Sequence, residues 1–326
     1  MALAWLEANR ASSLRQERRP YTIPVGRLQE RTFKVTISLT LDELNAASAT
    51  DFTAALGAIF ENAPWVAERA AAVRPFATVA ALHEAMLAAV RTAPPERVTS
   101  FLRGHPELAG AAAQAGAMGD ESKAEQAALG LHHPADDTAV LAALNAAYWG
   151  RFGFPFILCV RRHTRSSLAV ELRRRLQADP GAELETALNE VGFITRLRIA
   201  DRVAGPDMPA VNGSLTTHIL DTSIGCPAAG IALELLELGD GGATALPQAI
   251  SDRDGRTERP LLSGAPLRIG VYELRFHVGA YFAGRLPQQP PFLNTIPIRF
   301  GISEPEAHYH IPLLVSPGAY STYRGS

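Results

Sequence analysis

The chain has 326 residues, of which 47% are apolar and 20% are charged. That length favours two domains, each with enough apolar side chains for a buried core. The formal net charge is −2, from 31 basic and 33 acidic residues, so the overall composition offers no electrostatic attraction to nucleic acid or to an anionic membrane. No apolar stretch is long enough to cross a bilayer and the N-terminus lacks the apolar core of a secretory signal, so we expect a cytoplasmic protein.

The two cysteines favour the same compartment. Cys159 and Cys226 lie far apart, in segments of different character, which predicts free thiols in a reducing environment. The sequence assigns no role to the thiol of Cys226.

The first part of the chain is predicted to be helical. Residues 1–38 form an N-terminal extension that we leave unassigned, although "TFKVTISL" has the composition of a strand. Residues 39–203 are rich in alanine, and apolar residues recur there with helical spacing, as in Phe52, Leu56, Ile59 and Phe60. Prolines punctuate these segments at Pro64 and at Pro94-Pro95. The pattern predicts an all-α bundle of about eight helices.

The chain changes character after the helical part. Residues 204–213, within "AGPDMPAVNGS", have the composition of a linker. Residues 214–326 contain short segments with a period of two, such as "LTTHILDT" and "HYHIPLLVS", separated by turn signals such as "GDGG" and "RDGR". This pattern predicts an all-β antiparallel sandwich.

Three polar residues of the β part stand in positions that favour chemistry. His218 lies on the first predicted strand, Arg256 follows a turn, and His310 lies on the last predicted strand. Alternation places His308 and His310 on one face, with Tyr309 on the other. A histidine near neutral pKa can activate water, and an arginine can hold an anionic heterocycle. A single histidine on a strand is nevertheless more often an ordinary hydrogen-bonded side chain.

Taken together, the motifs of the β part resemble those of a known family. "LTTHILDTSIGCPAAGIALEL", "DGRTERPLL" and "HYHIPLLVSPGAYSTYRGS" resemble the 5-hydroxyisourate hydrolases, which are related to transthyretin. The resemblance implies a transthyretin-like sandwich that forms a homotetramer and opens the six-membered ring of its substrate. It implies catalytic roles for His218, Arg256 and His310, and a pocket completed by a C-terminal tail of four residues, Tyr323, Arg324, Gly325 and Ser326. The alternative is a transthyretin-like ligand carrier or assembly module fused to a helical interaction domain, but a carrier has no need of this polar set.

The helical part has its own candidates. His105 precedes a proline, which disfavours the α region and predicts a helix boundary with an accessible side chain. Ser122, Glu125 and Gln126 share one helical face, although Ser122-x-x-Glu125 is equally the spacing of a capping box. Arg198 lies late in a predicted helix, where a solvated arginine complements the helix dipole without any function.

Here too the motifs point to a family. "FENAPWVAERA", "HPELAG", "ESKAEQAALGL" and "FGFPFILCVR" resemble 2-oxo-4-hydroxy-4-carboxy-5-ureidoimidazoline decarboxylase, an all-α enzyme without metal or organic cofactor. The resemblance implies catalytic roles for His105, Glu125 and Arg198, with Arg196 as the alternative arginine. In the mechanism that these groups suggest, we expect Glu125 to orient His105. This chain departs from the family in having leucine at the small-residue position of "EQAALGL". The substrate contacts implied by the resemblance are Pro106, Ser122, Lys123, Ala124, Gln126, Phe154, Pro155, Phe156, Ile157 and Leu158.

The two resemblances imply consecutive steps of purine breakdown that end in (S)-allantoin, with an upstream urate oxidase as a candidate partner. A zinc amidohydrolase that uses His132, His133, His308 and His310 is the other enzymatic alternative. It is disfavoured because adjacent histidines cannot readily face one ion, and because no His-x-x-x-His with a partner carboxylate is present. The sequence therefore predicts no metal and no cofactor.

Overall fold

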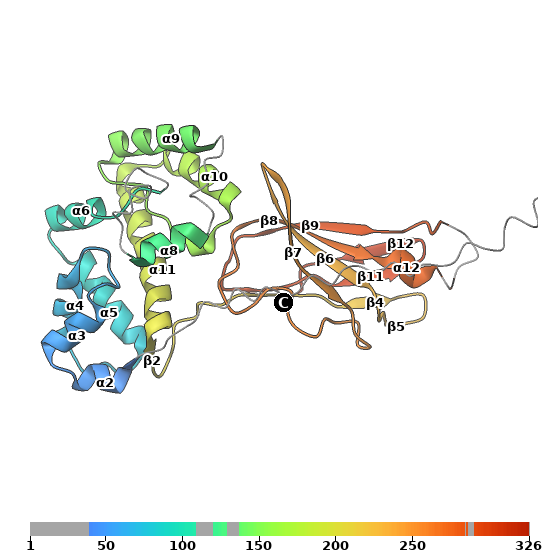
Figure 1. Cartoon of the computed structure of the whole chain (residues 1–326), viewed down its shortest axis with the longest axis horizontal. Coiled ribbons are helices and arrows are strands. Elements are labelled where there is room, and N and C mark those ends of the chain that lie inside the picture. The colour runs from blue at the N-terminus through green and yellow to red at the C-terminus, as the bar shows by residue number, and fades with distance from the viewer. Residues whose placement is uncertain (1–38, 109–119, 129–136, 284, 286–289, 326) are drawn as a thin grey trace, which may run out of the picture. The chain divides into compact units, whose positions relative to one another are not determined.

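The computed structural model describes residues 39–108, 120–128, 137–283, 285 and 290–325. The N-terminal extension, residues 1–38, lies outside this part of the chain. Apart from a two-residue strand at Leu39–Thr40 and a short helix at Val278–Phe282, helices come first in the described residues and strands follow, which confirms the predicted division into a helical and a β part (Figure 1). None of the described helices combines the length and the hydropathy needed to cross a membrane.

The described helical part contains several short helices and one long one. Their bounds are α2 (Leu41–Ala46), α3 (Ala49–Leu56), α4 (Pro64–Ala71), α5 (Val79–Arg91), α6 (Pro95–Arg103), α8 (Asp120–Ala128), α9 (Asp137–Phe152), α10 (Arg165–Arg175) and α11 (Pro180–Arg202). Pro64 is the first residue of α4, as predicted, and α5 ends before Pro94-Pro95, also as predicted. Pro95 in addition begins α6, because a proline at the first helical position loses no intrahelical hydrogen bond. Side chains of Ser, Thr and Asp cap most of the others, as when Thr40 and Glu43 form a capping box at α2.

One prediction about the helices is wrong. Phe52, Leu56, Ile59 and Phe60 are all buried, but α3 ends at Leu56, so the last two do not belong to its face. They lie in the turn that follows, where the chain folds back onto the same core. Asn62 takes a positive φ of 52° in this turn, a conformation that asparagine tolerates better than most residues. The turn thus carries buried residues into the wall of the site described below.

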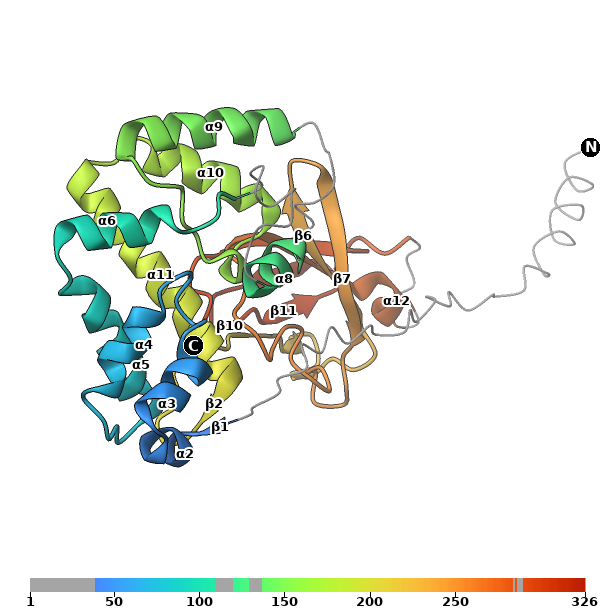
Figure 2. The same cartoon turned by 60° about the vertical axis from the view of Figure 1, so that its left-hand side comes forward.

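The long helix α11 supplies several of the buried polar residues of the helical part. Glu183, Glu190, Thr195 and Arg198 are all buried along it. Helix α11 passes beside α8 and α5 in both views (Figure 2). Buried charges are costly unless they are paired, so the charged residues among these are expected to have ionic or hydrogen-bonding partners inside the helical part.

The predicted linker is bonded at both ends. Val203–Ala204 forms strand β2, which pairs in parallel with β1 (Leu39–Thr40). The carbonyls of Pro206 and Asp207 then accept hydrogen bonds from the first turn of α5. At the other end the amide of Gly213 donates to the carbonyl of Ala265. The first residues of the linker are therefore bonded to the helical part, and its last residue is bonded to the β part.

The β part contains two four-stranded sheets. Their orders are β12-β11-β4-β5 and β7-β6-β8-β9, and β3 pairs separately with β10. The strands are β3 (Ser214–Thr216), β4 (Ile219–Asp221), β5 (Cys226–Pro227), β6 (Ala232–Gly239), β7 (Gly242–Ile250), β8 (Gly270–His277), β9 (Ile296–Ile302), β10 (His308–His310), β11 (Leu313–Ser316) and β12 (Ala319–Thr322), with the short helix α12 (Val278–Phe282) after β8. Inward residues of both sheets, among them Leu235, Leu274 and Leu313, belong to one buried core.

The antiparallel prediction is wrong for two strand pairs. Strand β4 pairs in parallel with β11, and β3 pairs in parallel with β10. Parallel neighbours need a long crossover, and here most of the β part lies between them in sequence. Short segments with a period of two do not reveal such long-range pairing.

The segment "HYHIPLLVS" was expected to be one strand and is two. Strand β10 ends at His310 and β11 begins at Leu313 in a different sheet, with Pro312 between them. The predicted alternation is confirmed, since Tyr309 is buried while His308 is exposed and His310 is half-buried on the opposite face. His310 is therefore not on the last strand: β11 and β12 form a hairpin after it.

Candidate active sites

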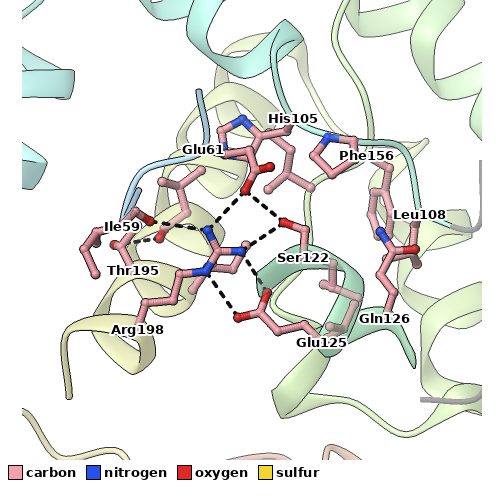
Figure 3. Close-up of a pocket in the computed structure, with 16 residues that line it drawn as sticks. Ile59, Glu61, His105, Leu108, Ser122, Glu125, Gln126, Phe156, Thr195 and Arg198 are labelled. Atoms are coloured by element: carbon pink, nitrogen blue, oxygen red, sulfur yellow. Dashed lines mark hydrogen bonds and ion pairs between the residues drawn. The ribbon is translucent and has the colours of Figure 1, made fainter. Parts of the chain in front are cut away.

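A pocket in the helical part gathers residues from five segments (Figure 3). The turn after α3, the residues after α6, helix α8, the segment before α10, and α11 all contribute to it. It includes most of the predicted residues of this part, namely His105, Pro106, Ser122, Glu125, Gln126, Phe156, Ile157, Leu158 and Arg198. The predicted contacts Lys123, Ala124, Phe154 and Pro155 do not line it, nor does Arg196.

Arg198 is the centre of the pocket's polar network. Its guanidinium donates to both carboxylate oxygens of Glu125, at 3.2 Å from Nε and 2.9 Å from Nη2. The hydroxyl of Ser122 accepts at 3.0 Å, the carboxylate of Glu61 at 3.2 Å and the carbonyl of Ile59 at 3.4 Å. Burial disfavours the charge, but these carboxylates outweigh it and raise the pKa of Arg198 above its usual value. The interpretation as a solvated arginine is therefore wrong.

Glu61 is a member of the site that the sequence did not single out. Its carboxylate accepts from the Ser122 hydroxyl at 2.9 Å as well as from Arg198. Ser122 lies within α8, which begins at Asp120, so the capping-box interpretation of Ser122 is wrong. Glu121, on the same helix, pairs with Arg198 and Arg202, and burial raises its pKa. Several carboxylates thus surround one buried guanidinium.

His105 lies just beyond the end of α6 and is held by that helix. Its Nδ1 is 3.1 Å from the carbonyl oxygen of Phe101, and its ring meets the Phe101 ring edge-on at 4.8 Å. A carbonyl can only accept, so Nδ1 carries the proton and Nε2 has the free lone pair. Burial lowers the pKa of His105 to about 4, which leaves the ring neutral at pH 7. We had expected Glu125 to orient this histidine; instead Phe101 does so, and Glu125 binds Arg198.

The β part brings its three predicted residues into one cluster. His218 lies between β3 and β4, and Arg256 closes the turn from Asp252. Burial lowers the pKa of His218, and the charge of Arg256 lowers it further. Burial also lowers the pKa of His310, with contributions from Arg256, His308 and His218. Arg256 is thus close enough to both histidines for its charge to lower their pKa values.

The C-terminal tail is fastened to His310. The amide of Gly325 donates to the His310 carbonyl at 2.9 Å. A Cβ at position 325 would lie 2.7 Å from Cδ2 of the His310 ring, so only glycine fits this approach. Arg324 pairs with Glu304 at 2.9 Å and lies over the ring of Tyr309. Tyr323 is exposed, and Ser326 lies outside the described residues.

Comparisons with known proteins match each part separately. Residues 45–200 match the model of the OHCU decarboxylase family, and residues 215–325 match that of the HIUase/transthyretin family. A 5-hydroxyisourate hydrolase of Halalkalibacterium halodurans is 52% identical over 119 residues, which is 36% of this chain and 100% of that protein. A 2-oxo-4-hydroxy-4-carboxy-5-ureidoimidazoline decarboxylase of Haloferax volcanii is 39% identical over 165 residues, 50% of this chain and 96% of that protein. The chain belongs to both families. A crystal structure of an (S)-allantoin synthase also aligns, with 34% identity and a TM-score of 0.48 over 88% of this chain and 100% of that one.

Buried polar side chains hold one wall of the pocket in the helical part. Arg175 is completely buried, donates to the carbonyl of Ile157 at 2.8 Å, and pairs with Glu183. From α11, Glu190 accepts from the amide of Cys159 at 2.8 Å. The two bonds fix the main chain on both sides of the lining residue Leu158. Arg175, Glu183 and Glu190 do not line the pocket themselves. They act on it by holding the main chain of its lining segment in place.

The described part of the HIUase region gives no support to a zinc site. No group of three or more His, Cys, Asp or Glu residues in the described ranges could hold a metal ion. His308 and His310 both contact the hydroxyl of Thr216. His132, His133 and the leucine of "EQAALGL" lie outside the described residues. The thiols of Cys159 and Cys226 are free, as predicted, the first buried and the second exposed.

Proposed function

We propose that this chain converts 5-hydroxyisourate to (S)-allantoin in two steps. The C-terminal part hydrolyses 5-hydroxyisourate, and the N-terminal part decarboxylates the product, 2-oxo-4-hydroxy-4-carboxy-5-ureidoimidazoline. The observation that carries the proposal is that one chain belongs to both families, each with its candidate residues gathered together. Both intermediates decompose in water to racemic allantoin, so fusion keeps the second site near the source of its substrate.

The hydrolytic step uses His218, Arg256 and His310. Either histidine, with its pKa below the usual value, is neutral near pH 7 and can accept a proton from water. The water oxygen then attacks a ring carbonyl carbon, and Arg256 stabilises the negative charge that develops on the carbonyl oxygen. The tail from Tyr323 to Ser326 completes the site by its attachment to His310.

The decarboxylation uses the free lone pair of His105. Loss of carbon dioxide leaves an electron pair on the ring carbon, delocalised into the neighbouring imine. Nε2 of His105 takes up the proton of the substrate hydroxyl, whose oxygen becomes the product carbonyl, and returns that proton to one face of the neighbouring ureido-bearing carbon, while the imine nitrogen takes a proton from water. All three guanidinium nitrogens of Arg198 already donate to acceptors. The substrate carboxylate therefore binds Arg198 by displacing one of its uncharged acceptors, the Ser122 hydroxyl or the Ile59 carbonyl. Glu61 and Glu125 keep the guanidinium in place.

The wider setting follows from the same families. We propose a homotetramer that assembles through residues 214–326, a helical domain at residues 39–203, and a linker between them. The chemistry needs neither metal nor cofactor. The exposed free thiol of Cys226 suits a reducing cytoplasm, and a urate oxidase that supplies 5-hydroxyisourate is the expected upstream partner.

The test is to supply freshly generated 5-hydroxyisourate and to follow both ultraviolet absorbance and circular dichroism. The first reports loss of substrate, and the second reports which allantoin forms. We expect accelerated loss of substrate and a single enantiomer. Ligand binding without turnover would instead favour a transthyretin-like carrier.

A further inference from the structure

One hydroxyl joins the two histidines of β10. Strands β3 and β10 pair in parallel with Thr216 opposite His310 and Ser214 opposite His308. The Thr216 oxygen is 2.7 Å from Nε2 of His308 and 2.9 Å from Nδ1 of His310. The centroids of the two rings are 6.2 Å apart, too far for a direct hydrogen bond between their nitrogens, so Thr216 is the bridge.

The bridge fixes the protonation of both rings relative to each other. Thr216 has one hydroxyl hydrogen, so it donates to one imidazole nitrogen and accepts an N–H from the other. If Nδ1 of His310 carries the hydrogen, Thr216 donates to His308, and Nε2 of His310 is free to accept a proton. Transfer of a proton from His310 to Thr216 and of another from Thr216 to His308 reverses the direction of both hydrogen bonds. Such a chain is a path along which a proton can travel.

We propose that Thr216 and His308 form a proton relay that carries the proton released by hydrolysis from His310 to solvent. This inference rests on the proposed hydrolase function of the same site. His308 is exposed while His310 is half-buried, so the path leads outward from the site.

The reaction leaves one proton to dispose of in each cycle. The water oxygen bonds to the carbonyl carbon while Nε2 of His310 takes one water proton. The electron pair of the breaking C–N bond stays on nitrogen, which takes the other water proton. The product therefore forms directly as a carboxylate, and the proton left over is the one that His310 took from water. That excess charge leaves when Nδ1 of His310 donates to Thr216, Thr216 donates to His308, and His308 releases a proton to bulk water.

The charged groups around His310 favour rapid removal of a proton from its ring. His310 faces Arg256, His218 and His308, and each of them disfavours a positive charge on its ring. The acidic residues near the site, Asp252 and Asp254, act on His218 instead. A proton stored on His310 would therefore repel the arginine that holds the substrate, and fast export relieves that repulsion.

The relay is tested by replacing each member in the full chain. Thr216→Val keeps the shape and removes the hydroxyl, and His308→Gln keeps a hydrogen-bonding partner that cannot relay a proton. We expect kcat for hydrolysis to fall at least about tenfold in both, with KM unchanged. Thr216→Ser should recover most of the rate that Thr216→Val loses, and added imidazole should restore His308→Gln. Ser214→Ala, on the same face of β3, is the matched control and should resemble the wild type.

A second readout separates this inference from the hydrolase proposal. In ¹⁵N-labelled protein without substrate, Thr216→Val should change the tautomer populations of both His308 and His310. Unchanged tautomers together with wild-type kcat would overturn the relay even if the chain hydrolyses 5-hydroxyisourate. Reduced kcat that imidazole cannot restore would also overturn it, because it would assign His308 a purely structural role. Absence of any wild-type hydrolysis would remove the hydrolase proposal and the relay with it, while coupled tautomers would remain as a structural fact.

Discussion

The contact between Gly325 and His310 gives the sharpest prediction for the hydrolase site. In Gly325→Ala the new Cβ would lie 2.7 Å from Cδ2 and 3.2 Å from Cβ and Cγ of His310. Ordinary contacts between such atoms begin at about 3.5 Å, so the ring and the tail must move apart by nearly 1 Å. A displacement of about 1 Å in a catalytic group costs roughly 10²-fold in rate. We therefore expect kcat/KM for hydrolysis to fall about 10²-fold.

The matched control lies in the hairpin just before the tail. A Cβ at Gly318 would meet no heavy atom within 4 Å, so Gly318→Ala should keep the wild-type rate. Hydrolysis is followed by the loss of ultraviolet absorbance of fresh 5-hydroxyisourate, and decarboxylation of the ring-opened product should be unaffected in both variants. Wild-type hydrolysis in Gly325→Ala would refute the idea that the tail positions His310.

Four further predictions concern the two sites and the core. Deletion of residues 323–326 should abolish hydrolysis while circular dichroism of the β part stays unchanged; full activity after truncation would contradict a role for the tail. Glu61→Gln, which weakens the anchor of Arg198, should lower kcat/KM for decarboxylation at least about tenfold and leave hydrolysis intact, and equal loss of both would point to misfolding. Since burial lowers the pKa of His105 to about 4, protonation removes its lone pair only at low pH, so decarboxylation should stay constant down to about pH 5 and fall to half near pH 4, not near 6.5. Arg175→Met leaves Glu183 buried without its cation, so urea unfolding of the helical part should show a loss of about 3–5 kcal/mol, and a change under 1 kcal/mol would show that the pair is dispensable.

Local signals in the sequence were enough to predict part of the fold. Pro64 begins α4 and Pro94-Pro95 follow the end of α5, because proline restricts its own and the preceding residue, which is a property of adjacent residues alone. The alternation of β10 likewise follows from strand geometry, with Tyr309 buried between two outward histidines.

Features that depend on distant segments were missed. Glu61 lies in the turn after α3, and its partners Ser122 and Arg198 are 61 and 137 residues away in sequence. The partner of His105 is a backbone carbonyl, which no side-chain motif encodes. The parallel pairing of β4 with β11 joins strands that are separated by most of the β part, so no local pattern reveals it.

The most direct test of the whole account compares wild type, His105→Ala and His310→Ala in one assay of fresh 5-hydroxyisourate. The account predicts that wild type forms (S)-allantoin alone, that His105→Ala hydrolyses at the normal rate but accumulates the ring-opened product, and that His310→Ala is impaired only in the hydrolysis. If one substitution abolished both steps, or if the wild type formed racemic allantoin, two separate active sites on one chain would be contradicted.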